Sequence, residues 1–339
     1  MNSTPEGPYR EITSMSSDRY QFRDVAEGVH FATASDRYAG WLGQIYSTDK
    51  GYKIKKSQKT LKGQKFTEEK VPVRSLEEFF QHYSALELDF TFYALLLNDD
   101  GTPSRNYAPL AEYAKWTPPD AKILLKVPET ICATKHWTIQ NGKRVFAEND
   151  DYLNPEKFTE RFYRPALEVM GNRIAGFIFE KGYQRKDATP PPEENIAQLD
   201  AFFAVIPNDT RYTIEERTDR LKTPDYFDFL RRRKIGNVFS HWTWLPDLNR
   251  QWEQAGGFTG NVSVTRLMTP LRMPYEEAYA RYFPFNELKD EFPEMYRDAA
   301  RIIREGMKDG IPTVTVSNNR AGGNANEINQ RILEQLGEK

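Results

Sequence analysis

The sequence predicts an α/β protein built as a single (β/α)8 barrel of the TIM type. Eight short runs rich in β-branched and aromatic residues alternate with eight helical patterns along the 339 residues. Such an eightfold alternation favours a closed parallel barrel with an outer ring of helices. The alternative, an open doubly wound sheet, is expected to carry a glycine-rich phosphate turn after its first strand. After the first predicted strand the sequence instead reads SDRYAGW, which favours the barrel.

Each predicted strand is a short β-branched or aromatic run, and each predicted helix has apolar residues at helical spacing. Some helices also have a recognisable start, as at Pro155, which follows the capping residue Asn154. The strands are expected at 29–34, 85–93, 122–127, 174–179, 211–217, 236–241, 262–268 and 312–317. The helices are expected at 75–83, 107–115, 155–170, 193–205, 224–234, 246–254, 287–308 and 325–336.

Two long connections interrupt the regular spacing, residues 35–74 after strand one and 128–154 after strand three. In a barrel both lie on the C-terminal face, where active sites are built. The first contains a basic run, KIKKSQKTLKGQK, from Lys53 to Lys65. We interpret this run as a solvated loop, with a phosphate or nucleic-acid clamp as the alternative.

The composition is that of a folded protein without bulk attraction to nucleic acid or anionic lipid. Hydrophobic residues make up 39%, aromatic residues 13%, and the net charge is −2. Cys132 is the only cysteine, which excludes an intrachain disulfide and a multi-cysteine zinc site and suits a reducing compartment. We find no signal peptide and no apolar run near the roughly 18 residues of a membrane span. We therefore expect a cytoplasmic protein with a flexible tail, 1–27, and one barrel domain, 28–339.

The run LELDFTFY, residues 86–93, alternates with a period of two. Because successive side chains of a barrel strand point alternately to the helices and to the barrel axis, its two sets of residues face opposite ways. Leu86, Leu88, Phe90 and Phe92 are expected to face the helices. Glu87, Asp89, Thr91 and Tyr93 are expected to face the axis.

Other strands are expected to add polar residues to the same interior. Glu215 and Arg217 point inward together on strand five, and Lys126 and Arg266 do so on strands three and seven, where the alternation is weaker. Strand eight is expected to turn Thr313, Thr315, Ser317 and Asn319 to the axis. Together with Glu87 and Asp89, these strands supply three acids and three bases.

Two interpretations of these charges stay open. One is a neutral ion-pair network that fills the barrel, because an isolated buried charge costs several kcal/mol. The other is a polar pocket for an anionic or hydroxyl-rich small molecule, in which Glu87 and Glu215 exchange protons. Among the four histidines, His241 at the end of strand six is the best placed for a site. No HExxH or paired histidine motif is present, and we predict no metal and no cofactor.

Six motifs, in the same order over roughly residues 29–337, resemble those of the DUF72 (YecE-like) family of uncharacterised proteins. ATASDRYAGWLGQIY (32–46) resembles GTSGWSY followed by W and FY, LELDFTFY (86–93) resembles VEINSTFY, WTPPDAKILLKVPETI (116–131) is similar to W–TPPxFxFxVKxPxxIT, YTIEER (212–217) resembles YAVEFR, VTRLM (264–268) resembles VRLHG, and VSNNRAGGNANEINQRILEQL (316–336) is similar to the closing FNND–G–A–NA–L segment.

The resemblance implies a TIM-barrel-like fold without an established activity, and a likeness to endonuclease-IV-like barrels suggests a metal-dependent phosphodiesterase as one alternative. Several positions depart from the family pattern. The GW pair is Ser35-Asp36, the Asn of NST is Asp89, and histidines are replaced at Ala133 and Met268. The motif positions that carry over are Thr33, Tyr38, Trp41, Glu87, Thr91, Tyr93, Lys126, Glu215, Arg217, Asn318 and Asn319.

We therefore expect a hydrolase-type enzyme with a polar pocket at the C-terminal mouth of the barrel. Glu87 and Glu215 are the candidate acid and base. A glycoside-like mechanism requires that their carboxyl groups lie about 5–10 Å apart and that neither is held by a base. The alternative from another class is a non-catalytic nucleic-acid or phosphate-ligand binder that uses Lys53–Lys65. The predicted ligand-binding residues are Thr33, Tyr38, Trp41, Asp89, Thr91, Tyr93, Lys126, Arg217, His241, Arg266, Asn318 and Asn319.

Overall fold

The computed structural model describes residues 19–140 and 142–337, and it contains the predicted barrel. Eight parallel strands form one sheet in the order β1-β12-β11-β10-β9-β8-β5-β4, and a parallel bridge from Ala34 to Glu87 joins its two edges. All eight predicted strands are present. They are β1 (Val29–Thr33), β4 (Ala85–Leu88), β5 (Lys122–Lys126), β8 (Ile174–Lys181), β9 (Tyr212–Glu216), β10 (Gly236–His241), β11 (Ser263–Leu267) and β12 (Thr313–Ser317).

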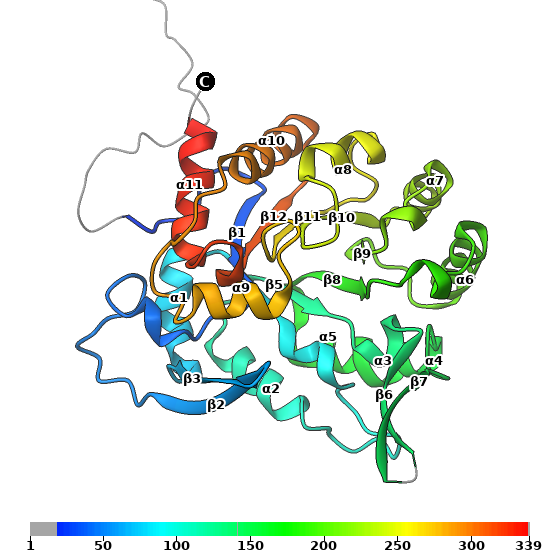
Figure 1. Cartoon of the computed structure of the whole chain (residues 1–339), viewed down its shortest axis with the longest axis horizontal. Coiled ribbons are helices and arrows are strands. Elements are labelled where there is room, and N and C mark those ends of the chain that lie inside the picture. Colours follow the sequence, from blue (N-terminus) through cyan, green and yellow to red (C-terminus); the bar gives the residue numbers. More distant parts are fainter. Residues whose placement is uncertain (1–18, 141, 338–339) are drawn as a thin grey trace, which may run out of the picture.

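Helices surround the strands (Figure 1). The predicted helix 155–170 forms in three consecutive segments, since a π-helical turn, Thr159–Tyr163, joins α4 to α5. The Asn154 side chain caps this helix as predicted, because its Oδ1 accepts a hydrogen bond from Lys157 N at 3.0 Å. The helices are α1 (Leu76–His82), α2 (Tyr107–Trp116), α3 (Glu129–Cys132), α4 (Pro155–Phe158), α5 (Arg164–Met170), α6 (Pro192–Val205), α7 (Pro224–Arg233), α8 (Leu248–Ala255), α9 (Tyr275–Tyr282), α10 (Pro293–Asp309) and α11 (Ala325–Gly337).

The two long connections contain antiparallel hairpins that the sequence did not predict. β2 (Lys55–Leu61) pairs with β3 (Gln64–Lys70), and β6 (Lys135–Gln140) pairs with β7 (Lys143–Glu148). Both hairpins lie on the same side of the barrel (Figure 1). The basic run from Lys53 to Lys65 is therefore mostly the β2 strand and its turn, not a loop.

The strands bury apolar residues on both faces. One cluster lies between strands and helices and includes Phe31, Leu86 and Ile214, while another fills the barrel axis. The axial cluster includes Val314 and Val316 of β12. The prediction that Thr313, Thr315 and Ser317 face the axis is therefore wrong. Ser317 instead donates a hydrogen bond to Asn329 of α11, at 2.6 Å.

The predicted strand 85–93 is too long. β4 ends at Leu88, and Asp89–Tyr93 forms a 3-10 turn. The alternation therefore places Glu87 in the axis and Leu86 toward the helices, as predicted, but it does not apply to the residues after Leu88. Phe92, expected to face the helices, instead lies over the ammonium group of Lys126.

The packed domain begins before residue 28. Tyr20 and Phe22 are buried, and Phe22 N donates a hydrogen bond to His82 O at 2.8 Å. Residues 1–18 of the predicted tail lie outside the described part of the chain. Over residues 19–140 and 142–337, none of the helices has both the length and the apolar character that crossing a membrane would require.

Candidate functional site at the barrel mouth

Arg266 of β11 lies at the centre of a buried cluster of charges inside the barrel. Its Nε and Nη2 donate to the two oxygens of Glu87, at 2.8 and 2.7 Å. Its Nη1 donates to Glu180 Oε2 at 2.8 Å and also to Glu215 Oε2. The arginine side chain is 3% exposed and both Glu87 and Glu215 are fully buried. One guanidinium group thus joins three carboxylates from β4, β8 and β9.

Glu180 of β8 is the acid that the sequence analysis missed. Its Oε2 lies 2.7 Å from Lys126 Nζ, and its Oε1 accepts from Arg217 Nη1 at 2.9 Å. Arg217 Nε also donates to Glu215, at 3.1 Å. The predicted strand ended at 179 and so left out Glu180, which lies on the same face of β8 as the axial residue Ile178. The network has three acids and three bases, as predicted, with Glu180 in the place of Asp89.

The network is electrostatically balanced. Burial raises the pKa of Glu87 despite the opposing effect of Arg266. For Glu180, burial is outweighed by Arg217, Lys126 and Arg266, which hold its pKa well below the ordinary value. Burial of Glu215 is likewise outweighed by Arg217 and Arg266, so its pKa is lowered. The three bases therefore keep Glu180 and Glu215 ionised near neutral pH.

Glu87 and Glu215, the predicted acid and base, are each bound to a base. Both have hydrogen bonds from Arg266, and Glu215 also accepts one from Ser240 Oγ at 2.6 Å. Neither carboxylate has exposed surface. A glycoside-like mechanism requires two carboxyl groups that are not bound to a base. This arrangement does not provide them.

Lys126 and Arg217 have the most exposed side chains of the network, and Glu180, at 8%, follows them. The side chains of the two bases are 9% and 14% exposed. Lys126 Nζ lies 4.1 Å from the centroid of the Phe92 ring. The guanidinium carbon of Arg217 lies 4.8 Å from the centroid of the Trp242 ring. An aromatic ring therefore covers each of these two bases at the mouth.

The turn after β4 holds two of the predicted residues in different settings. Thr91 is buried, and its hydroxyl donates to Lys126 O at 2.7 Å and to Leu88 O at 3.0 Å. It therefore connects the turn to β5. Tyr93 is 63% exposed, so its ring is open to solvent rather than in the barrel.

Several other predicted ligand-binding residues are occupied by contacts within the protein. Trp41 is fully buried against Tyr46, so it offers no free face. Thr33 donates to Ser35 O at 2.6 Å. The amide oxygens of Asn318 and Asn319 accept from backbone N–H groups of Arg320 and Ala325, respectively, at 3.0 and 2.7 Å.

His241 is buried on the other face of its strand from Ser240, and its Nδ1 lies 2.9 Å from Thr269 O. Burial lowers the pKa of His241 to about 4, which leaves the ring neutral near pH 7.

Within residues 19–140 and 142–337, no three or more His, Cys, Asp or Glu side chains are grouped so that they could hold a metal ion.

A small cavity of about 110 Å³ opens beside Glu87. Asp36, which follows β1, contributes a carboxylate that is almost fully buried. Its Oδ1 accepts a hydrogen bond from the Tyr113 hydroxyl at 2.8 Å, while its Oδ2 has no hydrogen-bond partner among the described residues. The cavity is lined by Ser35, Asp36, Arg37, Tyr38, Lys70, Glu87, Leu88, Asp89, Phe90 and Tyr113.

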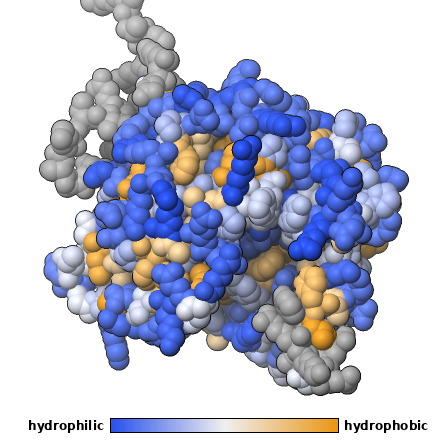
Figure 2. Space-filling model, viewed as in Figure 1, coloured by the Kyte–Doolittle hydropathy of each residue, from blue (hydrophilic) through white to orange (hydrophobic). Residues whose placement is uncertain are grey.

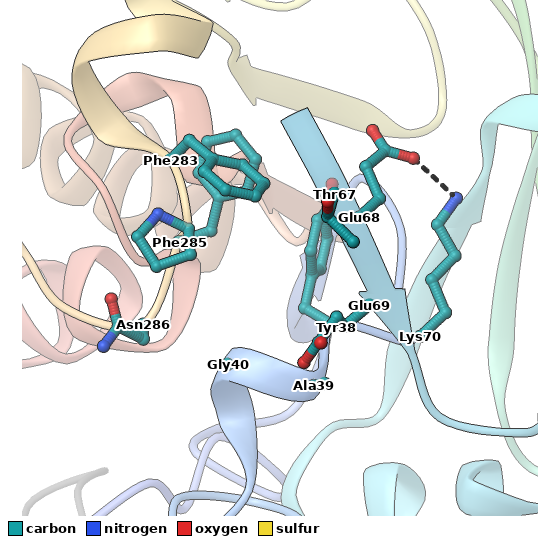
Figure 3. Close-up of a pocket in the computed structure, with 11 residues that line it drawn as sticks. Tyr38, Ala39, Gly40, Thr67, Glu68, Glu69, Lys70, Phe283, Phe285 and Asn286 are labelled. Carbon is teal, nitrogen blue, oxygen red and sulfur yellow. Dashed lines mark ion pairs between the residues drawn. The ribbon is translucent and has the colours of Figure 1, made fainter. Parts of the chain in front are cut away.

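A larger cavity of about 360 Å³ adjoins the first, since Tyr38 and Lys70 line both. Figure 3 shows its two walls, with the β3 residues Thr67–Lys70 on one side and Phe283, Phe285 and Asn286 on the other. Tyr38 packs against Phe285, with ring centroids 5.6 Å apart. The first hairpin thus forms one side of the larger cavity.

Exposed aromatic side chains gather in the segments that follow barrel strands. Tyr93 comes after β4, Tyr183 after β8, Trp244 after β10 and Tyr275 after β11, and each is at least 36% exposed. Since the carboxyl ends of parallel strands share one face of a barrel, these rings belong to the mouth. Figure 2 shows one side of the molecule, where hydrophilic residues predominate and hydrophobic residues form separate patches.

Comparison with known proteins gives a consistent result. The family model described as "Protein of unknown function DUF72" matches residues 55–339. A crystal structure of a DUF72 family protein from Enterococcus faecalis V583 is similar with a TM-score of 0.54 and 16% identity, covering 92% of this chain and 96% of that one. One from Thermotoga maritima MSB8 has a TM-score of 0.50 and 16% identity, covering 92% and 99%. No curated protein matches the sequence.

Proposed function

The chain belongs to the DUF72 family of proteins of unknown function, and we propose that its barrel mouth binds a small anionic or hydroxyl-rich molecule and hydrolyses it. The observation that carries the proposal is the position of Lys126 and Arg217. Both bases lie just below the surface of the mouth, and both are bridged by one carboxylate, Glu180.

Both bases keep donors for a ligand. An ammonium group has three N–H donors and a guanidinium group five. Within the described part of the chain, Lys126 has one polar contact, to Glu180. Among the described residues, the hydrogen bonds of Arg217 use Nε and Nη1, which leaves Nη2. Arg320 adds a third positive charge, since its guanidinium lies 4.8 Å from the ring of Tyr275 at the same face. Such donors suit a phosphate or carboxylate group.

For the hydrolytic step we retain Glu87 as the candidate acid and Glu215 as the candidate base. Their environments move their pKa values in opposite directions, upward for Glu87 and downward for Glu215, as a pair with these two roles requires. Because Arg266 binds both carboxylates and neither has exposed surface, the proposed step is not the glycoside-like one, and it requires that a bound ligand displaces Arg266 and opens access to both carboxylates.

Isothermal titration calorimetry with inorganic phosphate tests the binding part. We expect Lys126→Met to weaken phosphate binding at least about tenfold, because it removes a charge-assisted contact. Lys56→Met is the matched control, since Lys56 is an exposed hairpin lysine paired with Glu69, and it should leave the affinity unchanged. Absence of phosphate binding, or an equal loss in both variants, would overturn the binding proposal.

Release of p-nitrophenol from p-nitrophenyl phosphate and from p-nitrophenyl glycosides tests the hydrolase part. We expect turnover of at least one of these substrate classes and its loss in Glu215→Gln. If the wild-type protein that binds phosphate releases no p-nitrophenol from any of them, the protein is a binding protein and not a hydrolase of these classes.

The second candidate is a nucleic-acid binder, which the exposed rings of Tyr93, Tyr183 and Trp244 favour because bases stack on aromatic side chains. The hairpin lysines favour it less. Lys56 Nζ lies 2.6 Å from Glu69, and Lys59 Nζ lies 3.6 Å from Glu68. These acids on β3 offset part of the positive charge on which the alternative depended.

A further inference from the structure

Asp36 has the unusual combination of burial and an unused acceptor. Its side chain is 5% exposed, yet Oδ2 accepts no hydrogen bond from the described residues. Arg37 Nε lies 3.9 Å from this oxygen, which is too far for a hydrogen bond. The Tyr113 hydroxyl holds the other oxygen and so fixes the orientation of the carboxylate. A buried polar atom without a partner in a native protein calls for a physical explanation.

A cavity lined by Asp36 lies beside this carboxylate and is large enough to hold a ligand group. Its volume of about 110 Å³ is several times the roughly 10–15 Å³ that one water molecule requires on the same measure. Asp36 and Asp89 add acceptors to its wall, Arg37 and Lys70 add donors, and Tyr38 with other rings adds apolar surface. Acceptors, donors and ring faces together match a molecule with several hydroxyl groups on an apolar ring.

The cavity and the mouth bases are joined through the buried charge network. Glu87 lines the cavity and is linked to Lys126 through Arg266 and Glu180 by contacts of 2.7 to 2.8 Å. Asp89, at the cavity, and Phe92, over Lys126, belong to the same 3-10 turn. With a rise of about 2 Å per residue, these two positions lie about 6 Å apart along the turn. A monosaccharide with one phosphate group can cover such a distance.

We propose that the cavity beside Asp36 binds the hydroxyl groups of a ligand whose anionic group is held by Lys126 and Arg217, so that the substrate class is a sugar phosphate. This inference rests on the proposed function of the mouth and adds the identity of the ligand. Asp36 accepts a hydrogen bond from one hydroxyl group through Oδ2, and Asp89 accepts from a second. Burial raises the pKa of Asp36 to about 6, so its carboxylate is the form present at pH 7.5, where the test is made.

The test compares dissociation constants for inorganic phosphate, glucose 6-phosphate and ribose 5-phosphate at pH 7.5 in the wild type, Asp36→Asn and Asp89→Asn. We expect at least one sugar phosphate to bind the wild type at least about tenfold more tightly than phosphate, and each substitution to remove most of that advantage, because each removes a charged acceptor. Phosphate affinity should stay within about twofold in both variants. Asp89→Asn keeps the experiment decisive if Asp36→Asn does not fold.

The outcomes separate the two proposals. If phosphate binds but neither sugar phosphate binds more tightly, or if both variants keep the full advantage, the assignment of a sugar phosphate is overturned and the anion site stands. If the wild type does not bind phosphate or the sugar phosphates, the proposed function itself fails, and this inference fails with it.

Discussion

Arg266 and Glu87 form a bidentate ion pair across the interior of the barrel. The two hydrogen bonds, Nε to Oε2 and Nη2 to Oε1, are 2.8 and 2.7 Å long. The residues come from β11 and β4, which are not neighbours in the sheet. Because the same guanidinium also binds Glu180 and Glu215, a single side chain holds carboxylates from three strands in one place.

Replacing Arg266 should therefore destabilise the protein strongly. Arg266→Met leaves Glu87 without its bidentate partner, and breaking a buried pair in this way typically costs roughly 3–5 kcal/mol. Arg297→Met is the control, since that arginine is 60% exposed and lies 4.0 Å from Glu294; it should change stability by less than about 0.5 kcal/mol. Urea unfolding followed by circular dichroism measures both. Similar small effects for the two variants would mean that the network contributes little to stability.

Asp36 should make stability fall as the pH rises through its folded pKa. Its ordinary value of 3.8 is raised to about 6 by burial, against the opposing effects of Arg37 and the Tyr113 hydrogen bond. The folded state therefore binds the proton more tightly than the unfolded chain. Between about pH 4 and pH 6 this group takes away up to about 3 kcal/mol of stability.

Asp36→Asn removes this titration. The stability of the variant relative to the wild type should rise between pH 4 and pH 7, as measured by urea unfolding at each pH. Asp150→Asn, at an exposed position, serves as the control. Its stability relative to the wild type should not rise between pH 4 and pH 7. A relative stability of Asp36→Asn that stays constant over the range would contradict the burial of an ionisable carboxylate at this position.

The same substitution at two tryptophans should change stability by very different amounts. Trp41 is fully buried, whereas Trp244 is 53% exposed at the mouth. Trp41→Ala should cost roughly 3–5 kcal/mol of unfolding free energy, because a large side chain is removed from the core. Trp244→Ala should change stability by no more than about 0.5 kcal/mol. Thermal unfolding of the two variants compares them directly, and a mild effect at Trp41 would show that its ring is not part of the core.

The accuracy of the sequence analysis varied with the kind of pattern. The strands were recognisable because buried β-branched and aromatic runs have few other interpretations, and alternation placed Glu87 and Glu215 in the barrel interior together. The same alternation failed after Leu88, since the chain leaves the sheet there for a 3-10 turn that no proline or glycine announces. On β12 every residue is buried, so the polarity of its side chains could not show which of them face the barrel axis and which face the helices.

The site was less predictable than the fold. The first hairpin escaped notice because most of β2 is exposed and because the covered face of β3 carries Glu68 and Lys70 beside Phe66, which leaves no apolar period-two signal. Glu180 was missed by one residue at the end of a strand. Asp36 was noticed only as a departure from the family pattern, and its importance depends on Tyr113, which lies 77 positions away along the chain.

The hairpin acids should limit binding of nucleic acid. Glu68 and Glu69 lie next to Lys59, Lys70 and Lys56, so replacing both acids by glutamine leaves the lysines uncompensated. The double variant should elute from heparin at higher salt than the wild type, because more cations contact the polyanion. Substitution of Glu276 and Glu277, in the first turn of α9, by glutamine is a control with the same change in charge. If the two double variants elute together, local pairing on the hairpin has no special effect.

A crystal structure of the protein with inorganic phosphate tests the proposed anion site most directly. The account predicts phosphate oxygens within hydrogen-bond distance of Lys126 Nζ and Arg217 Nη2, beneath the rings of Phe92 and Trp242. Phosphate bound only elsewhere, for example on the lysines of the β2–β3 hairpin, with the contacts of Glu180 to Lys126 and Arg217 unchanged, would contradict it.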